Sequence, residues 1–190
     1  LTERAVAEQL TWACAERIAK QLPETGIPEE LKALRSALAK TYYANLSIFR
    51  SAPDTWAIDQ LFPVMPIHRL NEKPDELGSF ADLTCDSDGK LERFIDNGKT
   101  KSLLELHTFR EGEPYWIGMF LAGAYQEVMG NLHNLFGSTN AVNISLNENG
   151  DYRLDHVVKG DTNAQVLEIM EHNPDELLER LRIASETAIR

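Results

Sequence analysis

The run CDSDG at residues 85–89 brings together side chains that could take part in catalysis. It places the thiol of Cys85 beside the carboxylates of Asp86 and Asp88, directly after an apolar segment that we expect to be a strand. A thiol exchanges its proton readily, and a carboxylate binds cations through charge-assisted hydrogen bonds. The run therefore offers a proton donor next to an anionic binding group. The alternative is a turn in which the aspartates accept backbone N–H groups and Gly89 adopts a left-handed conformation.

The same run has the Asp-x-Asp-Gly pattern of calcium-binding loops, but the neighbouring residues exclude such a loop. If Asp86 and Asp88 occupied its third and fifth positions, Thr84 and Ile95 would occupy the first and the twelfth. Both of those positions need an acidic side chain, above all a bidentate glutamate at the last. The sequence therefore predicts no calcium loop here.

The segment 118–137, GMFLAGAYQEVMGNLHNLFG, crowds small residues before Tyr125. We expect a strand to pass into a helix at this point. Gly123 and Ala124 would let a ligand approach the backbone closely, and a helix start offers free N–H groups at the positive end of its dipole. A phosphate or a carboxylate could bind there, with the Tyr125 hydroxyl as a further donor. The alternative is a packed helix start with Tyr125 in the core.

The other residue types give no pattern typical of a metal or nucleotide site. The histidines are not spaced to share a helix face, and no cysteine accompanies them at the spacing of zinc ligands. The chain has no phosphate-loop pattern, no G-x-S-x-G turn and no Rossmann glycine pattern. We therefore expect no structural metal site. The tryptophans are expected in the core rather than on a surface that stacks bases.

Composition limits the class of protein. The 190 residues are 43% hydrophobic and 26% charged, as in globular proteins, and no apolar run is long enough to cross a bilayer. The formal net charge of −11 repels phosphate backbones, so we expect no nucleic-acid partner. The lack of a long apolar run leads us to expect no membrane partner either. The chain begins at Leu1 without a secretory signal. We expect an internal piece of a longer cytoplasmic protein, with Cys14 and Cys85 reduced.

Apolar periodicity predicts helices at both ends of the chain. Residues 2–22 and a second segment beginning at Pro28 repeat apolar residues at helical spacing, and Pro23 and Gly26 separate them. The second stripe continues as far as Tyr42, so the two helices would form an antiparallel hairpin. Helical spacing returns after residue 160.

Between the helical ends, short segments rich in β-branched and aromatic residues alternate with turn residues, which predicts strands. Asn149-Gly150 is typical of a type I′ hairpin turn, and one helix at 125–135 interrupts the strands. The predicted strands are 43–50, 56–60, 64–68, 79–84, 102–106, 115–121, 142–147 and 151–157. The predicted domains are a helical hairpin at 1–42, a β-rich body at 43–160 and C-terminal helices at 161–190.

Three of these stretches resemble one protein family in their order and spacing. They are NLSIFRSAPDTWAIDQLFPVMPIHRL from residue 45, FADLTCDSDG from residue 80, and the 118–137 segment. Together they resemble the C-terminal region of bacterial biosynthetic arginine decarboxylase, a pyridoxal-phosphate-dependent family related to ornithine and diaminopimelate decarboxylases. The resemblance covers nearly the whole chain.

The resemblance implies a fold and an assembly. Such fold-type III enzymes pair a (β/α)8 barrel, which carries the cofactor lysine, with a β-sandwich or Greek-key domain. We therefore expect a mixed α and β chain whose β-rich body is that second domain, with flanking helices. The implied assembly is a homodimer or a larger homo-oligomer. Its active site would form where the second domain of one subunit reaches the barrel of its neighbour.

The resemblance also implies roles for single residues. Cys85 resembles the catalytic cysteine that delivers a proton to the α-carbon after carbon dioxide leaves. Asp86 resembles the carboxylate that binds the distal cation of the substrate, here the guanidinium of L-arginine. Asp59 resembles a second acidic residue that faces the substrate tail, and Asp88 either assists Asp86 or holds the turn. Tyr125 resembles the tyrosine that contacts the cofactor phosphate.

The implied reaction is the decarboxylation of L-arginine to agmatine in polyamine biosynthesis. Its cofactor is pyridoxal 5′-phosphate, and family resemblance adds Mg²⁺. No lysine of the chain lies in a context that matches the cofactor lysine, so we expect that lysine outside the chain and the fragment alone to be inactive. The alternative is a non-catalytic interaction or regulatory module with the decarboxylase fold. Retention of Cys85, Asp86 and Tyr125 together argues against it.

Overall fold

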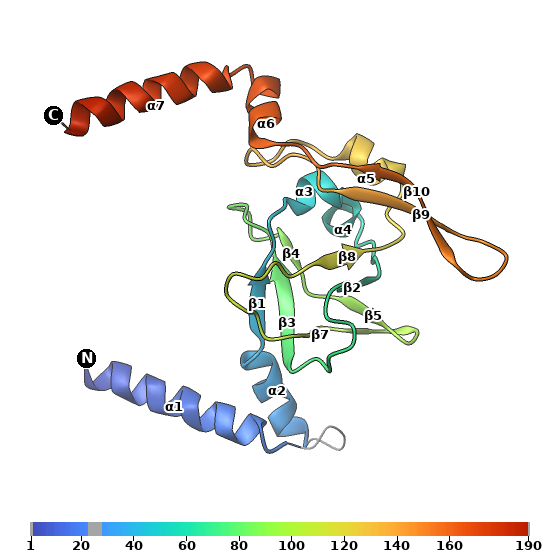
Figure 1. The fold of residues 1–190 in the computed structure, drawn as a ribbon. Helices are drawn as coiled ribbons and strands as arrows, with labels where there is room; N and C mark the ends of the chain where they lie inside the picture. Colours follow the sequence, from blue (N-terminus) through green and yellow to red (C-terminus); the bar gives the residue numbers. More distant parts are fainter. Residues whose placement is uncertain (1, 23–27, 190) are drawn as a thin grey trace. The chain divides into compact units, whose positions relative to one another are not determined.

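The computed structural model describes residues 2–22 and 28–189, so the predicted helix breakers Pro23 and Gly26 lie outside the described residues. Two compact units are built from interleaved segments (Figure 1). Unit 1 comprises the chain up to Tyr42, Leu61–Ala81 and Leu91–Phe120; unit 2 comprises Tyr43–Gln60, Asp82–Lys90 and the chain from Leu121 onward. The division into domains at 42/43 and 160/161 stays a prediction about the complete protein.

The two N-terminal helices form as the periodicity predicts, with shorter bounds. Helix α1 spans Glu3–Ala19, and the hydroxyl of Thr2 caps it by accepting a backbone N–H of the first turn. Helix α2 spans Glu29–Ala37, with Pro28 at its N-cap. Because α2 ends there, Tyr42 does not continue the helical stripe and lies on a strand instead.

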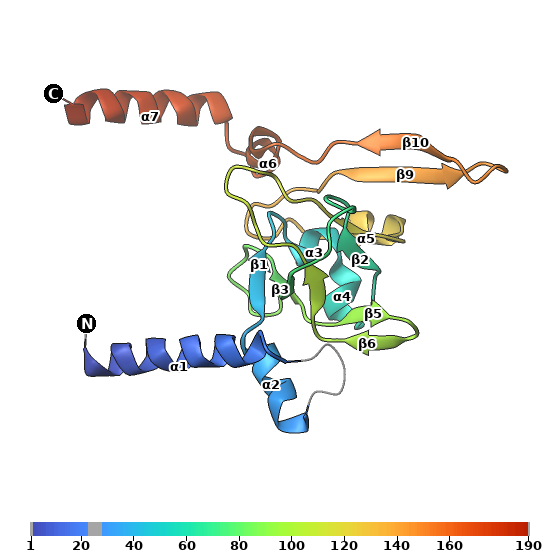
Figure 2. The same ribbon diagram turned by 60° about the horizontal axis from the view of Figure 1, so that its bottom comes forward.

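Short strands make up the rest of unit 1. The largest sheet has four strands, in which β3 pairs antiparallel with β7 and the remaining order is β1-β3-β4. Two further pairs are antiparallel, β2 with β8 and β5 with β6 (Figure 2). The strands are β1 (Lys40–Tyr43), β2 (Val64–Pro66), β3 (Glu76–Ala81), β4 (Lys90–Leu91), β5 (Phe94–Asp96), β6 (Lys99–Lys101), β7 (Leu104–Leu106) and β8 (Ile117–Met119).

The core of unit 1 follows the two-residue period of its strands. In β7, Leu104 and Leu106 are buried while Glu105 between them is exposed. Phe80 of β3 and Phe94 of β5 complete the buried cluster, with their rings edge to face at 6.2 Å. Alternation in the sequence therefore marks which side chains enter the core.

Asn97-Gly98 joins β5 to β6 in a turn that the strand pattern did not single out. Both residues have positive φ, 45° and 78°, and Asp96 pairs directly with Lys99 across them. A two-residue loop with positive φ at both positions is the type I′ turn, for which Asn-Gly is the preferred pair.

The prediction of that turn at Asn149-Gly150 is wrong, although the hairpin itself forms. Gly150 has φ 83°, but the loop has three residues, because Asn147 and Asp151 pair on either side of it. The side chain of Asn147 accepts the N–H groups of Asn149 at 3.1 Å and Asp151 at 2.8 Å. These bonds favour a three-residue loop with glycine in the left-handed position.

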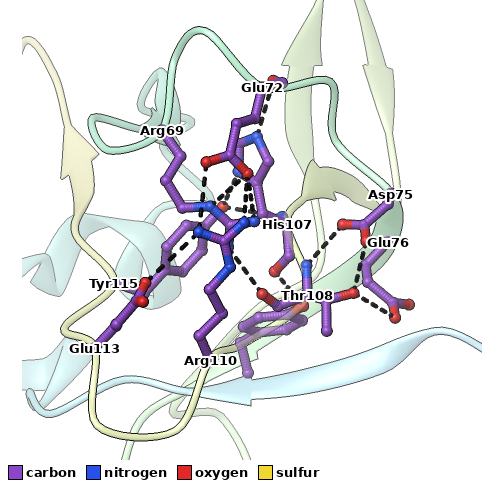
Figure 3. A network of polar contacts seen from close by, with 10 residues as sticks. Arg69, Glu72, Asp75, Glu76, His107, Thr108, Arg110, Glu113 and Tyr115 are labelled. Atoms are coloured by element: carbon purple, nitrogen blue, oxygen red, sulfur yellow. Dashed lines mark hydrogen bonds and ion pairs between the residues drawn. The ribbon is translucent and has the colours of Figure 1, made fainter.

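A network of polar side chains lies beside the core of unit 1 (Figure 3). Arg69 contacts Glu72 at 2.6 Å and donates to the carbonyl of Thr108 at 2.9 Å, and Arg110 reaches Glu72 at 2.8 Å. The carboxylate of Asp75 accepts the N–H of Thr108 at 2.7 Å and its hydroxyl at 2.8 Å. The network thereby joins the segment before β3 to the one after β7.

His107 is buried in this network and has one consistent hydrogen-bond pattern. The hydroxyl of Tyr115 accepts the His107 backbone N–H at 3.0 Å, so its proton is directed to Nδ1 of His107 at 2.7 Å. The other ring nitrogen then donates to the carbonyl of Glu72 at 3.0 Å. Tyr42 donates to the His107 carbonyl at 3.0 Å, and burial, aided by Glu76, raises the pKa of Tyr42 to about 12.

Unit 2 contains short helices, one hairpin and the C-terminal helices. The predicted strands 142–147 and 151–157 form β9 and β10, which pair antiparallel, and the helices predicted after residue 160 form α6 and α7. The elements are α3 (Ile48–Ser51), α4 (Pro53–Ala57), α5 (Ala124–Met129), β9 (Ala141–Leu146), β10 (Tyr152–Val158), α6 (Asn163–Ile169) and α7 (Pro174–Ile189).

The segments 43–50 and 56–60, for which composition predicts strands, instead contribute to helices. Ser47 caps α3 by accepting the N–H of Arg50 at 3.3 Å, and Pro53 is the first residue of α4. Both are helix-start signals, and they prevail over the aromatic and β-branched composition. The apolar residues of these segments serve the interior of the unit instead of a strand; Ile48, for example, is only 2% exposed.

The mixed α and β class is confirmed, and the described strands form several small sheets. The predicted helix at 125–135 is shorter and ends at Met129.

We expect unit 1 to lose stability in acid through the network. Hydrogen bonds from Thr108 lower the pKa of Asp75, and a hydrogen bond from Arg69 lowers that of Glu72. A carboxyl whose pKa is lower in the folded state stabilises the fold above its unfolded pKa, and this contribution is lost as the pH falls through the folded value. The loss should therefore occur below about pH 4.

Urea unfolding at pH 7 and at pH 3 tests this expectation on Asp75→Asn. The variant should be less stable than the unsubstituted chain at pH 7 and should lose less stability on acidification. Asp96→Asn is the matched control, because Asp96 is an exposed carboxylate of the same unit. Equal acid sensitivity of Asp75→Asn and the unsubstituted chain would contradict the account.

Candidate functional site

The run at 85–89 forms an exposed turn in unit 2. The thiol of Cys85 is free and exposed, and Asp86 and Asp88 are exposed as well. Asp86 accepts the backbone N–H of Asp88 at 3.0 Å, and its own carbonyl accepts the N–H of Gly89 at 3.1 Å. Asp86 thus holds the turn, and its carboxylate keeps acceptor sites for a ligand, because a carboxylate has about four lone-pair positions.

Gly89 is required by close packing and not by a left-handed backbone. It does not belong to the glycines with positive φ. A β-carbon at this position would lie 2.2 Å from Oδ1 of Asp82, too close for any side chain. The left-handed conformation that the turn pattern predicts is therefore wrong, and the carboxylate of Asp82 is the physical reason for the glycine.

Asp82 anchors the turn from within the fold. It is only 4% exposed, and its carboxylate accepts the Ile48 N–H at 2.9 Å, the Thr84 N–H at 2.9 Å and the Thr84 hydroxyl at 2.7 Å. Its backbone N–H donates to the carbonyl of Gly89 at 2.7 Å. The two ends of the turn are therefore tied together and to the start of α3.

Tyr125 lies in the first turn of α5 with its side chain 72% exposed, so the alternative that placed it in the core is wrong. Its neighbour Gln126 enters the interior instead and is 4% exposed. A β-carbon on Gly123 would meet no atom within 4 Å, so the space before the helix is open. The Tyr125 hydroxyl is thus accessible to a ligand.

Two side chains fix α5. Gln126 donates to Oδ2 of Asp54 at 2.6 Å and accepts the Asp54 N–H at 3.2 Å, which joins α5 to α4. Arg50 of α3 donates to the carbonyls of Glu127 and Gly130, both at 2.8 Å, at the end of α5 where carbonyls lack helical partners. The three short helices α3, α4 and α5 contact one another (Figure 1).

Asp59 follows α4 and is exposed, with φ 58°. Aspartate tolerates this left-handed conformation better than most residues. All five sequence-predicted site residues therefore lie in unit 2. Cys85, Asp86 and Asp88 share one turn. Asp59 follows α4 and Tyr125 belongs to α5, and a hydrogen bond between Asp54 and Gln126 joins these two helices.

Sequence reasoning missed the residues that hold these groups in place, namely Asp82, Arg50, Asp54 and Gln126. The signal available for Asp82 was its polar side chain directly after an apolar strand. The partners of Arg50 lie 77 and 80 residues away along the chain, so local patterns could not show them.

Within residues 2–22 and 28–189, no group of three or more His, Cys, Asp or Glu side chains is placed to hold a metal ion. Mg²⁺ stays an expectation from the family resemblance. Among the described helices, none has the length and apolar character to span a membrane.

We expect Arg50→Ala to destabilise unit 2 by about 2–4 kcal/mol, because it leaves two carbonyls and the Ser138 hydroxyl without their charged donor. Arg153→Ala is the matched control, since the Arg153 side chain is 77% exposed and its pair with Asp155 should be worth at most about 1 kcal/mol. Urea unfolding of the chain measures both. Equal losses would contradict the assigned role of Arg50.

No protein-family model matches the chain. Over its full length it is 74% identical to the biosynthetic arginine decarboxylase of Prochlorococcus marinus strain MIT 9303 and 56% identical to that of Nostoc sp. PCC 7120. The chain spans 29% and 28% of the length of these two relatives.

The chain is also similar to a solved structure of the same family. The crystal structure of the biosynthetic arginine decarboxylase from Campylobacter jejuni matches 80% of this chain and 25% of its own chain, with 36% sequence identity and a TM-score of 0.56. The resemblance carried by the three motifs is therefore confirmed. Over its whole length, the chain is similar to a segment of biosynthetic arginine decarboxylases that makes up about 29% of their length.

Proposed function

We propose that the chain is the C-terminal part of an arginine decarboxylase, which converts L-arginine to agmatine and carbon dioxide. The observation that carries this proposal is the 74% identity, across all of the chain, to a protein with that name. The site supports it independently, because a free thiol, exposed carboxylates and an exposed tyrosine lie in one unit.

Cys85 delivers a proton to the α-carbon after carbon dioxide has left. The reaction needs such a donor, because the α-carbon exchanges its carboxyl group for hydrogen. The exposed Cys85 is held on a braced turn and can face a substrate that the rest of the enzyme binds. A positioned acid of this kind accelerates proton transfer by about 100- to 10,000-fold.

Asp86 binds the guanidinium of arginine. A guanidinium presents paired N–H donors to a carboxylate, and such charge-assisted bonds are stronger than neutral ones. Asp88 supports Asp86 through its backbone N–H at 3.0 Å. Asp59, exposed after α4, supplies a second negative charge toward the substrate tail.

Tyr125 contacts the phosphate of pyridoxal 5′-phosphate. Its exposed hydroxyl and the open space at Gly123 fit an oxyanion that approaches from outside the unit. When bound, this cofactor serves as the sink for the electron pair left by decarboxylation. The lysine that holds it covalently belongs to a barrel outside this chain, so the chain alone is inactive.

The β-rich body is the β-sandwich or Greek-key domain of the enzyme, and it delivers Cys85 and Asp86 across a dimer interface to the barrel of a neighbouring subunit. The exposed apolar side chains of β9 and β10 support extensive packing against further protein, because large exposed apolar surfaces mark interaction sites. They include Val142, Ile144, Leu146, Leu154, Val157 and Val158.

A non-catalytic module with the same fold is the second candidate, and the structure does not favour it. Such a module would need the packing surfaces alone. Separate hydrogen bonds brace the turn at 85–89 and helix α5, both of which carry exposed reactive groups.

The proposal is tested in a chimera, in which this chain replaces the matching segment of the Prochlorococcus marinus enzyme. Cys85→Ala should lower kcat by about 100-fold or more, because it removes the proton donor. Cofactor absorbance should be retained. Cys14→Ala is the matched control, since Cys14 is also a free, exposed thiol but lies in unit 1. Unchanged turnover in Cys85→Ala would refute the catalytic assignment.

Asp86→Asn in the same chimera should raise KM for arginine by about 10- to 100-fold, the equivalent of one charge-assisted hydrogen bond. The change removes the charge and keeps the shape, so kcat should fall less than KM rises. Asp175→Asn, an exposed aspartate at the start of α7, is the control. A KM equal to that of the unsubstituted chimera would show that Asp86 serves the turn only.

A further inference from the structure

Asp82 is a carboxylate that the proposed chemistry does not use, yet it is almost fully buried. Burying a charged group is unfavourable unless hydrogen bonds replace its water. Asp82 receives three such bonds, from the Ile48 N–H and from the N–H and hydroxyl of Thr84. Both oxygens of Asp82 therefore serve as acceptors. An asparagine or glutamine side chain would not match, because its NH₂ group would face one of these donors.

These bonds act on the turn that carries the candidate catalytic groups. Thr84 directly precedes Cys85, so both of its bonds to Asp82 fix the chain immediately before the thiol. At the far end, the Asp82 N–H bonds the Gly89 carbonyl at 2.7 Å, and the Asp82 carboxylate fills the space where a β-carbon of Gly89 would lie. One residue thus sets both ends of the turn.

The third bond of the carboxylate reaches α3, the helix that also holds α5. Ile48, the first residue of α3, donates to Asp82, and Arg50, two residues later, donates to the end of α5. Ser47 and Ile48 are 0% and 2% exposed, so this short helix is enclosed by the unit. Helix α3 therefore connects the turn of Cys85 to the helix of Tyr125.

We propose that Asp82 is a positioning residue: it places Cys85 and Asp86 for the reaction and fixes them relative to Tyr125 through α3. The inference rests on the proposed function. Asp82 touches neither substrate nor cofactor in this role, and its effect on the reaction passes through the turn.

The test uses the chimera with Asp82→Asn. One carboxylate oxygen becomes an NH₂ group that faces N–H or O–H donors, so at least one of the three bonds is lost. We expect kcat/KM for arginine to fall by about 100-fold, as for a displaced catalytic group, with cofactor absorbance retained. Gly89→Ala should produce a similar loss by a separate route, because its β-carbon presses on the same carboxylate.

Asp75→Asn is the matched control. Asp75 also accepts the N–H and hydroxyl of a threonine, Thr108, but it belongs to unit 1, whereas the turn belongs to unit 2. It should leave kcat and KM unchanged. Thr84→Ala is a milder variant for the case that Asp82→Asn and Gly89→Ala do not fold, because it removes only the bond from the Thr84 hydroxyl to Asp82. We expect Thr84→Ala to lower kcat/KM by about 10-fold.

A double variant separates positioning from general destabilisation. If Asp82 acts through the turn, Asp82→Asn should reduce kcat much less in the Cys85→Ala background than in the unsubstituted chimera, because residues that act as one unit are not additive. Additive losses would overturn the inference, as would full activity of folded Asp82→Asn, Gly89→Ala or Thr84→Ala variants. If Cys85→Ala and Asp86→Asn are themselves fully active, the proposed function fails instead.

Discussion

A buried carboxylate needs donors around it, and the fold of unit 2 supplies them to Asp82 from two directions. Thr84 closes on it from the turn, and Ile48 reaches it from the start of α3, 34 residues earlier in the chain. The positions of Cys85 and Gly89 follow from these contacts. The turn carries Cys85 outward because its ends are tied at Asp82, and the glycine at position 89 is imposed by the carboxylate that lies against it.

The other candidate segment depends on the same short helix. Arg50 satisfies carbonyls at the end of α5, and Gln126 turns inward to Asp54, so Tyr125 is left exposed at a fixed place. Helices of four to six residues are not stable by themselves. Here side-chain hydrogen bonds and contacts with buried neighbours stabilise the short helices. The exposed turn at 85–89 and helix α5 are therefore both held by side-chain hydrogen bonds within unit 2.

Local signals in the sequence predicted part of this arrangement. β-branched and aromatic composition with turn residues located β9 and β10, helical spacing located α6 and α7, and the order of three motifs identified the family. Composition failed at α3 and α4, where Ser47 and Pro53 start helices in segments whose apolar residues suggested strands. The Asp82 contacts could not be predicted, because the donor at Ile48 is distant in sequence and a backbone N–H has no residue signature. The same holds for Gly89, whose cause is a side chain and not its own backbone angle.

We propose that this chain presents Cys85 and Asp86 to arginine in a complete decarboxylase. A crystal structure of the chimera with agmatine and pyridoxal 5′-phosphate tests it most directly. The account predicts that the Asp86 carboxylate bonds the guanidinium of agmatine, that the Cys85 thiol faces the carbon bearing its amino group, and that Tyr125 contacts the cofactor phosphate. A structure in which the turn at 85–89 lies away from the bound agmatine would contradict it.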